Sequence, residues 1–285
     1  MGSNSFTHGM THLVDPWRAM KRVAWLTDLH LNWLTVAQTS AFLARLAKVE
    51  ADAVLLSGDL SEAPELARHL RLLANSSPRP VYFVLGNHDF YFSSIREVRA
   101  ITRRVCEEIG GLHWMTERTV ESLAEQTGII GHDSWADARL GDYERSFVSM
   151  NDARLIDEFV GRNKEQRLEV LHALGDEAAA HFANVLPEAL SRFRNVLLLT
   201  HVPPFREACW YDGHISDDQW LPHFSCRAVG DALVSIMREH PRRQLTVLCG
   251  HTHGQGECWP LPNLRVLTGG AEYGHPRVQR VLEIE

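Results

Sequence analysis

The chain changes from apolar to polar within one short stretch, VYFVLGNHD at residues 81–89. Five consecutive apolar residues predict a strand that is covered on both faces of its sheet. The same change recurs along the chain, where short apolar runs end in Asp, His, Asn or Gly. The strands expected from this pattern are Arg22–Thr27, Ala53–Ser57, Val81–Leu85, Gly128–Ile130, Val196–Thr200 and Leu245–Cys249.

Segments with helical periodicity separate these strands. They are Val36–Val49, Pro64–Ala74, Ile95–Ile109, Glu177–Phe193 and Val229–Glu239. Alternating strands and helices predict an α/β fold with a mostly parallel central sheet. Ligands of such sheets bind beyond the carboxyl ends of the strands, so we expect the polar clusters to converge on one rim. Two further strands, at 264–268 and 278–284, could complete a second sheet.

The chain has no internal repeat and no flexible linker, so we expect one domain over residues 21–285, after a polar, disordered tail at 1–20. Two irregular stretches, about 134–162 and 203–227, follow expected strands. We call them the cover segments, because long loops at such a rim usually cover a site. The second holds several aromatic residues, Trp210, Tyr211, Trp220 and Phe224. These suit stacking on a nucleobase and packing within the cover equally well.

Composition excludes several classes of protein. The formal net charge of −7 offers no basic face, so a long nucleic acid is not an expected partner. The five cysteines are scattered without a C-x-x-C pair, which favours reduced thiols in a cytoplasmic protein over a disulfide framework. No apolar stretch approaches the roughly 18–20 residues of a membrane span, so no membrane partner is expected. The sequence leaves the oligomeric state undetermined.

Taken singly, most of the polar clusters are weak evidence for a metal site. D-x-H at 28–30, G-D at 58–59 and G-H-T-H at 250–253 are all found in ordinary turns. G-N-H-D at 86–89 is more informative, because buried polar side chains are costly to retain for packing alone. Two prolines, Pro203 and Pro204, come one residue after His201. They fix the backbone that leaves the strand.

Taken together and in this order, the five motifs resemble the pattern of the calcineurin-like metallophosphoesterases, from Asp28 to His253. The resemblance implies an α/β fold that is a four-layer α/β/β/α sandwich of two mixed sheets flanked by helices. The metal site would lie at the C-terminal ends of the strands. The first metal would be bound by Asp28, His30, Asp59 and His253. The second metal would be bound by Asp59, Asn87, His201 and His251, so that Asp59 bridges both ions.

The resemblance also assigns roles beside the metals. His88 would protonate the leaving-group oxygen or stabilise the charge of the transition state, without binding metal. We expect Asp89 to orient His88 or a metal ligand. His132 and Asp133 follow an expected strand on the same rim. They either support a ligand or contact the substrate, or they form an ordinary loop pair.

The chemistry of the donors explains the choice of residue types. Imidazole and carboxylate suit divalent transition-metal ions, here Mn, Fe or Zn, with Co and Ni as further candidates. Two such ions about 3.5–4 Å apart can bridge a water and convert it to hydroxide near neutral pH. The two ions carry four positive charges, whereas two aspartates and one hydroxide carry three negative charges. The site therefore stays positive and favours phosphate.

The resulting prediction is a hydrolase of phosphomonoesters or phosphodiesters. Its partner would be a small phosphorylated substrate, for which a nucleotide is one candidate. A nuclease acting on DNA or RNA ends is the alternative among enzymes, and a non-catalytic metal-binding scaffold is the alternative from another class. Leu60-Ser61-Glu62 lacks the arginine that protein Ser/Thr phosphatases of this superfamily carry there, which disfavours phosphoproteins as substrates.

Overall fold

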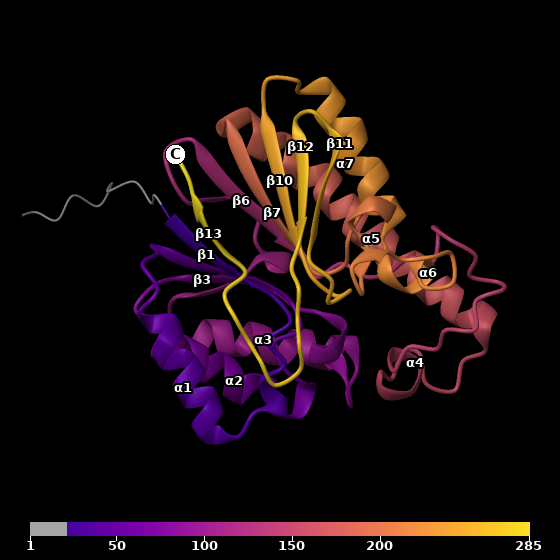
Figure 1. Ribbon diagram of the computed structural model, residues 1–285, viewed down its shortest axis with the longest axis horizontal. Coiled ribbons are helices and arrows are strands. Elements are labelled where there is room, and N and C mark those ends of the chain that lie inside the picture. The colour runs from indigo at the N-terminus through magenta and orange to yellow at the C-terminus, as the bar shows by residue number, and fades with distance from the viewer. Residues whose placement is uncertain (1–21) are drawn as a thin grey trace, which may run out of the picture.

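Two β-sheets packed face to face form the centre of the molecule (Figure 1) in the computed structural model, which describes residues 22–285. The tail expected at 1–20 lies outside the described residues. The first sheet has the order β13 (Arg280–Glu283), β1 (Arg22–Leu26), β2 (Ala53–Ser57), β3 (Val81–Val84) and β4 (Leu112–Trp114). The second has the order β11 (Gly256–Leu261), β12 (Leu264–Thr268), β10 (Gln244–Cys249), β7 (Asn195–Thr200), β6 (Thr127–His132) and β5 (Glu121–Ser122).

Helices cover the outer face of each sheet (Figure 1). On the first sheet lie α1 (Val36–Ala47), α2 (Ala63–Ser76) and α3 (Ile95–Glu108). On the second lie α5 (Lys164–Arg192) and α7 (Arg227–Glu239). Between the two sheets, Trp25, Leu55 and Leu199 belong to one buried apolar cluster, and each sheet shares a further cluster with its helices. These layers confirm the expected four-layer sandwich. Within residues 22–285, no helix combines the length and the apolar character needed to cross a membrane.

The pattern of alternating elements predicted a mostly parallel central sheet, but it did not indicate how the strands divide between two sheets. Parallel pairing joins β1, β2 and β3 in one sheet, and β6, β7, β10 and β12 in the other. Buried strands of both sheets are equally apolar, so periodicity does not tell which strands pair. Of the two late strands, 264–268 becomes β12 of the second sheet. The other becomes β13, which pairs antiparallel with β1 in the first sheet.

Helix α5 begins at Lys164 rather than at the expected Glu177. Asn163 caps it, because its side chain accepts from the backbone N–H of Gln166. The early part of the helix is rich in charged residues and buries few side chains, Leu171 among them. The apolar periodicity that predicts a helix is therefore weak over this part of α5.

The two cover segments lie side by side beyond the rim (Figure 1, right). They contain the short helices α4 (Asp152–Leu155) and α6 (Leu221–Phe224), and a hairpin of β8 (Trp210–Tyr211) and β9 (His214–Ile215). Backbone hydrogen bonds join the segments, for example from Ala138 to Pro222 at 3.1 Å.

Helix α7 takes its N-terminal cap from a distant residue. Its own N-cap residue, Cys226, makes no side-chain cap bond. The buried carboxylate of Asp137 accepts instead from the backbone N–H groups of Arg227 at 3.1 Å and Ala228 at 2.8 Å. These two hydrogen bonds connect the first cover segment to a helix that covers the second sheet.

We expect Asp137→Ala to lower the free energy of unfolding by about 1–3 kcal/mol, because two helix N–H groups lose their acceptor. Chemical denaturation measures the change. Asp231→Ala removes an exposed carboxylate that pairs with Arg227 on the surface of the same helix. This control should change the free energy by less than about 0.5 kcal/mol. Equal losses in the two variants would contradict the cap.

Candidate metal centre

The polar clusters that follow the strands meet at one rim of the two sheets. Strand β1 leads to Asp28 and His30, β2 to Asp59, β3 to Asn87 and His88, β7 to His201, and β10 to His251 and His253. The structure therefore brings together side chains from both sheets. His30 and His253, for example, are 223 positions apart in the chain, yet their rings are adjacent.

One group of ligand atoms lies at the ends of β1, β2 and β10. It consists of one atom each from Asp28, His30, Asp59 and His253, all within 4.8 Å of one another. The Nε2 atoms of His30 and His253 are 3.2 Å apart. His253 Nε2 lies 3.5 Å from Asp28 Oδ1, and His30 Nε2 lies 3.7 Å from Asp59 Oδ2. Atoms that share one ion through bonds of about 2.0–2.2 Å have separations of this size, so this first group could hold a metal ion.

A second group of ligand atoms lies beside the first. Asn87 Oδ1 is 3.2 Å from His201 Nε2 and 3.0 Å from His251 Nδ1. His201 Nε2 is also 3.4 Å from Asp59 Oδ1. Asp59 thus faces the first group with Oδ2 and the second group with Oδ1. A carboxylate that bridges two ions needs this position.

Hydrogen bonds behind the second group decide which imidazole atoms face inward. His201 Nδ1 donates to the carbonyl of Ser57 at 2.9 Å, so the lone pair of a neutral ring lies on Nε2. His251 Nε2 donates to the carbonyl of His223 at 2.9 Å, so the lone pair lies on Nδ1. Bonds of this kind commonly fix the tautomer of a metal-binding histidine.

The amide of Asn87 is oriented in the same way. Its Nδ2 donates to Asp152 Oδ1 at 2.8 Å and to the hydroxyl of Tyr91 at 3.1 Å, and that hydroxyl donates to Asp152 at 2.9 Å. Asn87 Oδ1 is thereby turned toward His201 and His251. With neutral rings, three acceptors then face one another without a shared proton, which is unfavourable unless a cation lies between them. The donor set therefore fits a metal ion.

Electrostatics at the rim also favour a cation. Burial lowers the pKa of His30 to about 3 and that of His251 to about 4, which keeps both rings in the neutral form that binds metal. Burial raises the pKa of Asp59, but the charges of His201 and His88 outweigh burial and hold it well below its usual range. Burial lowers the pKa of His201, but Asp59 outweighs that effect and raises it to about 10. The position between Asp59 and His201 thus attracts positive charge, whether a proton or a metal ion.

The turns that carry these side chains have an unusual backbone. Asp28, His30, Asp59, His251 and His253 all have φ between 42° and 69°. Residues other than glycine rarely adopt this left-handed region, and such strain clusters at functional sites. The concentration of strained residues at one rim supports a site rather than ordinary loops.

Two motif glycines make room for the carboxylates. A Cβ atom at Gly86 would lie 2.2 Å from Asp59 Oδ1, and one at Gly250 would lie 2.0 Å from Asp28 Oδ2. Any side chain at either position would displace a carboxylate. This contact explains why the polar clusters at 86–89 and 250–253 begin with glycine.

His88 lies at the mouth of the site. Its Nε2 is 4.0 Å from Asp59 Oδ2, and its backbone N–H donates to Asp59 Oδ1 at 2.9 Å. The ring packs against His30 and Tyr91, with centroid distances of 4.6 and 4.3 Å. Its side chain is 14% exposed. The ring is therefore held beside the ligand groups while it remains accessible to a substrate.

Asp89 connects two of the turns. Its buried carboxylate accepts from the backbone N–H groups of Leu60 at 3.2 Å, Ser61 at 2.7 Å and Gly86 at 2.9 Å. The turn after β2 is thus bound to the turn that carries Asn87. These bonds support the expectation that Asp89 orients a ligand, and that role stays a prediction.

His132 and Asp133 lie at the same rim but outside both groups of ligand atoms. Asp133 Oδ1 accepts from the backbone N–H of Leu85 at 2.7 Å and from Trp114 Nε1 at 2.9 Å. His132 Nε2 lies 3.7 Å from Glu177 Oε1. Asp133 therefore binds the end of β3, and His132 lies beside Glu177 of helix α5. A contact with the substrate stays a prediction for these two residues.

Sequence analysis did not single out three residues that shape the site. Tyr91 and Asp152 fix the Asn87 amide, and Tyr273 forms a wall beside the first group. The ring centroid of Tyr273 lies 4.5 Å from that of His30, and the residue is 40% exposed. None of the three belongs to a motif, so only their position in space reveals them.

Comparisons with known proteins identify structures of the same fold. The structure resembles that of a phosphopantetheinyl hydrolase from Mycobacterium tuberculosis, with a TM-score of 0.65 and 16% identity over 93% of this chain and 96% of that one. It also resembles a dimetal phosphatase from Danio rerio, with a TM-score of 0.55 and 15% identity over 88% of each chain. At these identities the likeness shows a shared fold alone. A comparison with curated protein sequences found no match.

A family model gives the assignment that the structural likeness cannot. The model described as calcineurin-like phosphoesterase matches residues 21–255, which include every motif at the rim. Proteins of this family bind a dinuclear divalent metal site, and the clustered Asp and His side chains supply ligands for one. The chain therefore belongs to the calcineurin-like phosphoesterase family and is a metal-dependent phosphoesterase.

Proposed function

We propose that this protein hydrolyses a phosphomonoester or phosphodiester of a small molecule, with two divalent transition-metal ions bound at the rim. The observation that carries the proposal is the buried Asp59 carboxylate, whose two oxygens face two separate groups of ligand atoms. Mn, Fe and Zn are the metals we propose, and Co and Ni are further candidates, because imidazole and carboxylate donors suit these ions.

The ligands divide between the two ions as the two groups do. We assign Asp28, His30, Asp59 and His253 to the first ion. We assign Asp59, Asn87, His201 and His251 to the second. When bound, two such ions lower the pKa of a shared water and polarise the phosphate oxygens. The protein contributes the orientation, since the carbonyls of Ser57 and His223 and the carboxylate of Asp152 hold the second group in place.

His88 is the residue we assign to the leaving group. Its ring is accessible and stands beside Asp59, and its Nδ1 atom is buried without a hydrogen-bond partner among the described residues. We infer that Nε2 gives a proton to the departing oxygen or stabilises the charge that develops there.

The substrate class rests on charge and on similarity. Two divalent ions exceed the charge of Asp28 and Asp59, so an anionic group is favoured at the rim. The two structurally similar proteins are a dimetal phosphatase and a phosphopantetheinyl hydrolase, which agrees with a phosphate ester as substrate.

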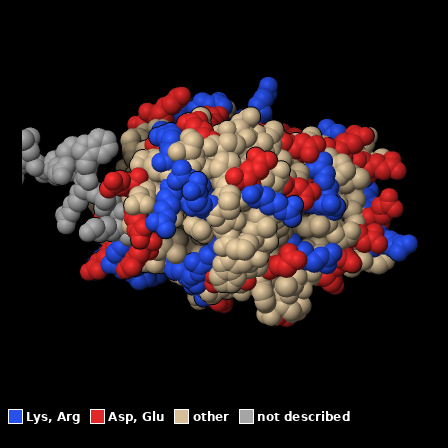
Figure 2. Space-filling model, turned by 90° about the horizontal axis from the view of Figure 1, so that it is seen from above, with Lys and Arg blue, Asp and Glu red and all other residues tan. Residues whose placement is uncertain are grey.

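The two alternatives are less well supported. A nuclease needs a basic surface along its substrate, whereas Lys and Arg are interspersed with Asp and Glu on the face seen in Figure 2, and the net charge is −7. A non-catalytic scaffold has no need for an accessible His88 beside a complete set of ligands. Salt-sensitive binding of an oligonucleotide would favour the nuclease.

Asp59→Asn is expected to reduce the metal content below two ions per chain and to lower turnover at least about 100-fold, because an amide has only one oxygen to share between two ions. Metal analysis and hydrolysis of an aryl phosphate with added Mn measure both effects. Asp231→Asn, on the surface of α7, is the matched control. Normal turnover in Asp59→Asn would refute the bridging role.

His88→Ala is expected to lower kcat by about 10²–10⁴-fold while the metal content stays at that of the unchanged protein. The backbone N–H of residue 88 still donates to Asp59 in this variant, so the ligand groups keep their arrangement. Metal analysis and steady-state kinetics separate the two effects. A variant that loses metal would show that His88 is a ligand.

Asp152→Asn is expected to weaken binding of the second ion about 10–100-fold, because the Asn87 amide loses a charged acceptor. The Mn concentration that gives half-maximal activity measures this affinity. Asp157→Asn changes an exposed carboxylate of the same cover segment and should leave the midpoint unchanged. A midpoint that does not move in Asp152→Asn would contradict the orienting role.

A further inference from the structure

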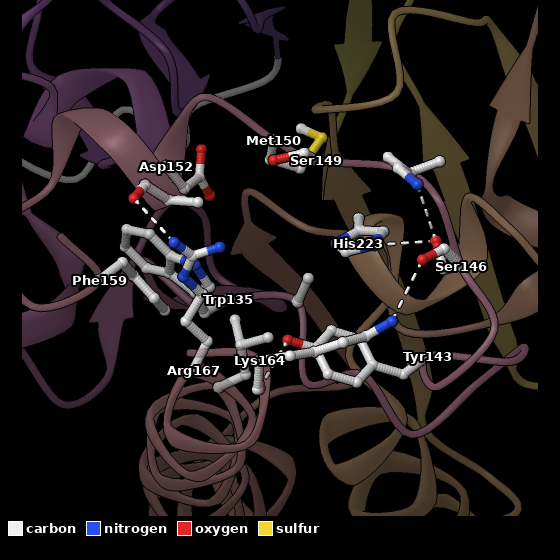
Figure 3. Close-up of a pocket in the computed structure, with 14 residues that line it drawn as sticks. Trp135, Tyr143, Ser146, Ser149, Met150, Asp152, Phe159, Lys164, Arg167 and His223 are labelled. Carbon is white, nitrogen blue, oxygen red and sulfur yellow. Dashed lines mark hydrogen bonds between the residues drawn. The ribbon is translucent and has the colours of Figure 1, made fainter. Parts of the chain in front are cut away.

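A pocket of about 180 Å³ opens beside the second group of ligand atoms (Figure 3). We call it the side pocket. The residues that matter here are Tyr143, Asp152, Phe159, Lys164, Arg167 and His223. They come from both cover segments and from the first turn of α5.

Two residues that line the side pocket also make hydrogen bonds to ligands of the second group. Asp152 accepts the hydrogen bond of Asn87 Nδ2 at 2.8 Å. The backbone carbonyl of His223 accepts from His251 Nε2 at 2.9 Å. The pocket thus adjoins the residues that orient Asn87 and His251, and a substrate whose phosphate lies at the rim would need to reach past them to enter it.

Two cations of the side pocket lack a carboxylate partner. In Figure 3, Arg167 lies below Asp152, and Lys164 extends toward Ser146. Within residues 22–285, neither side chain has a carboxylate within ion-pair distance, whereas Arg139 pairs with Asp137 and with Asp176.

Arg167 is also poorly satisfied as a hydrogen-bond donor. Its Nε is buried without a partner among the described residues, and one terminal nitrogen donates to the carbonyl of Ala153 only at 3.5 Å. A guanidinium has five donors in a fixed fork that matches phosphate and carboxylate. Unmet donors of a partly buried cation are costly, so an anion from outside the chain would stabilise this arrangement.

The ammonium group of Lys164 is held by two backbone carbonyls and an aromatic ring. Its Nζ donates to the carbonyls of Glu144 at 2.7 Å and Ser146 at 3.2 Å, and it lies 5.1 Å from the centroid of the Tyr143 ring. An ammonium group has three donors. Two of its three donors are therefore engaged by these carbonyls.

The charges of the side pocket sum to a positive value. Lys164 and Arg167 stand against one carboxylate, Asp152, whose Oδ1 is already bonded to Asn87 and Tyr91. An anion in the pocket therefore meets a net charge of about +1.

The walls are apolar between these charges. Trp135, Met150, Phe159 and Leu171 line the pocket beside the polar groups. A cavity of about 150 Å³ accommodates a benzene ring, so the volume here suits a short chain that ends in an anionic group. Apolar walls with a few convergent polar groups are typical of small-molecule sites.

We propose that the side pocket binds a second anionic group of the substrate, in contact with Lys164 and Arg167, while the phosphate that reacts lies at the metal centre. The preferred substrate is then a short-chain phosphate ester whose far end carries a second phosphate or a carboxylate. This inference rests on the proposed function for its reaction, but the pocket can also be tested by binding alone.

The kinetic test compares monophosphates with bisphosphates of the same diols, from propanediol to hexanediol, on the Mn-loaded protein. The bisphosphate of one chain length should have a kcat/KM at least about tenfold higher than its monophosphate, because a charge-assisted contact contributes about that factor. Arg167→Gln and Lys164→Gln should each remove most of this advantage, chiefly through KM, and change turnover of the monophosphate less than about twofold.

Arg162→Gln is the matched control. Arg162 is exposed just before α5 and does not line the side pocket, so this variant removes one positive charge nearby without touching the site. It should retain the preference for the bisphosphate. A loss in this control equal to that in Arg167→Gln would mean that net charge, rather than the pocket, selects the substrate.

The binding test uses compounds that cannot be hydrolysed. Calorimetry on the Mn-loaded protein compares propylphosphonate with propane-1,3-bisphosphonate and longer homologues. Tighter binding of a bisphosphonate by about tenfold or more, lost in Arg167→Gln, supports the proposal.

The two proposals fail in different ways. If monophosphates and bisphosphates are hydrolysed equally well by the unchanged protein and all variants, the side pocket inference is overturned and the phosphoesterase function stands. If no ester is hydrolysed, the function fails, and the bisphosphonate titration still decides whether the pocket binds an anion.

Discussion

The buried carboxylate of Asp59 is the contact on which both halves of the site depend. It ends β2 in the first sheet, accepts from the backbone of His88 and faces His30 of the same sheet. Its other side faces His201, which ends β7 in the second sheet. The sheets must therefore pack in one register, and the apolar cluster between them, which includes Leu55 and Leu199, holds that register. Sheet packing and metal geometry are thus one constraint.

The rim combines strained turns with a rigid frame. Left-handed backbone at residues such as Asp28 and His253 costs on the order of 1–3 kcal/mol each and persists only where the surroundings determine it. Here, hydrogen bonds to buried carboxylates hold the turns in this conformation. Asp89 binds the turn after β2 to the turn after β3, and Asp133 binds the end of β3. Through these bonds, side chains that touch no metal ligand directly can still set the ligand positions.

The cover segments differ from the rim in kind. The rim uses residues at strand ends that belong to the family pattern. The side pocket is instead lined by Asp152 and His223 of the cover segments and by Lys164 of α5, none of which belongs to a motif. Chemistry common to a family sits on its rigid scaffold, and selectivity resides in the loops above it. In this protein the two meet at Asn87, whose amide is fixed by Asp152 of a cover segment.

The sequence by itself determined the elements and the chemistry. Apolar runs that end in Asp, His and Asn marked the strands and their shared rim, and the order of the motifs led, through a family resemblance, to the proposed ligand set and to the proposed role of His88. Tertiary structure alone decided how the strands divide between two sheets, because buried strands of either sheet read alike. It also decided which lone pairs face inward, since the carbonyls of Ser57 and His223 are ordinary backbone atoms that leave no trace in the sequence. Only the structure shows that Lys164 and Arg167 have no carboxylate partner within residues 22–285. From sequence alone, a charged side chain is expected to be a solvated surface residue.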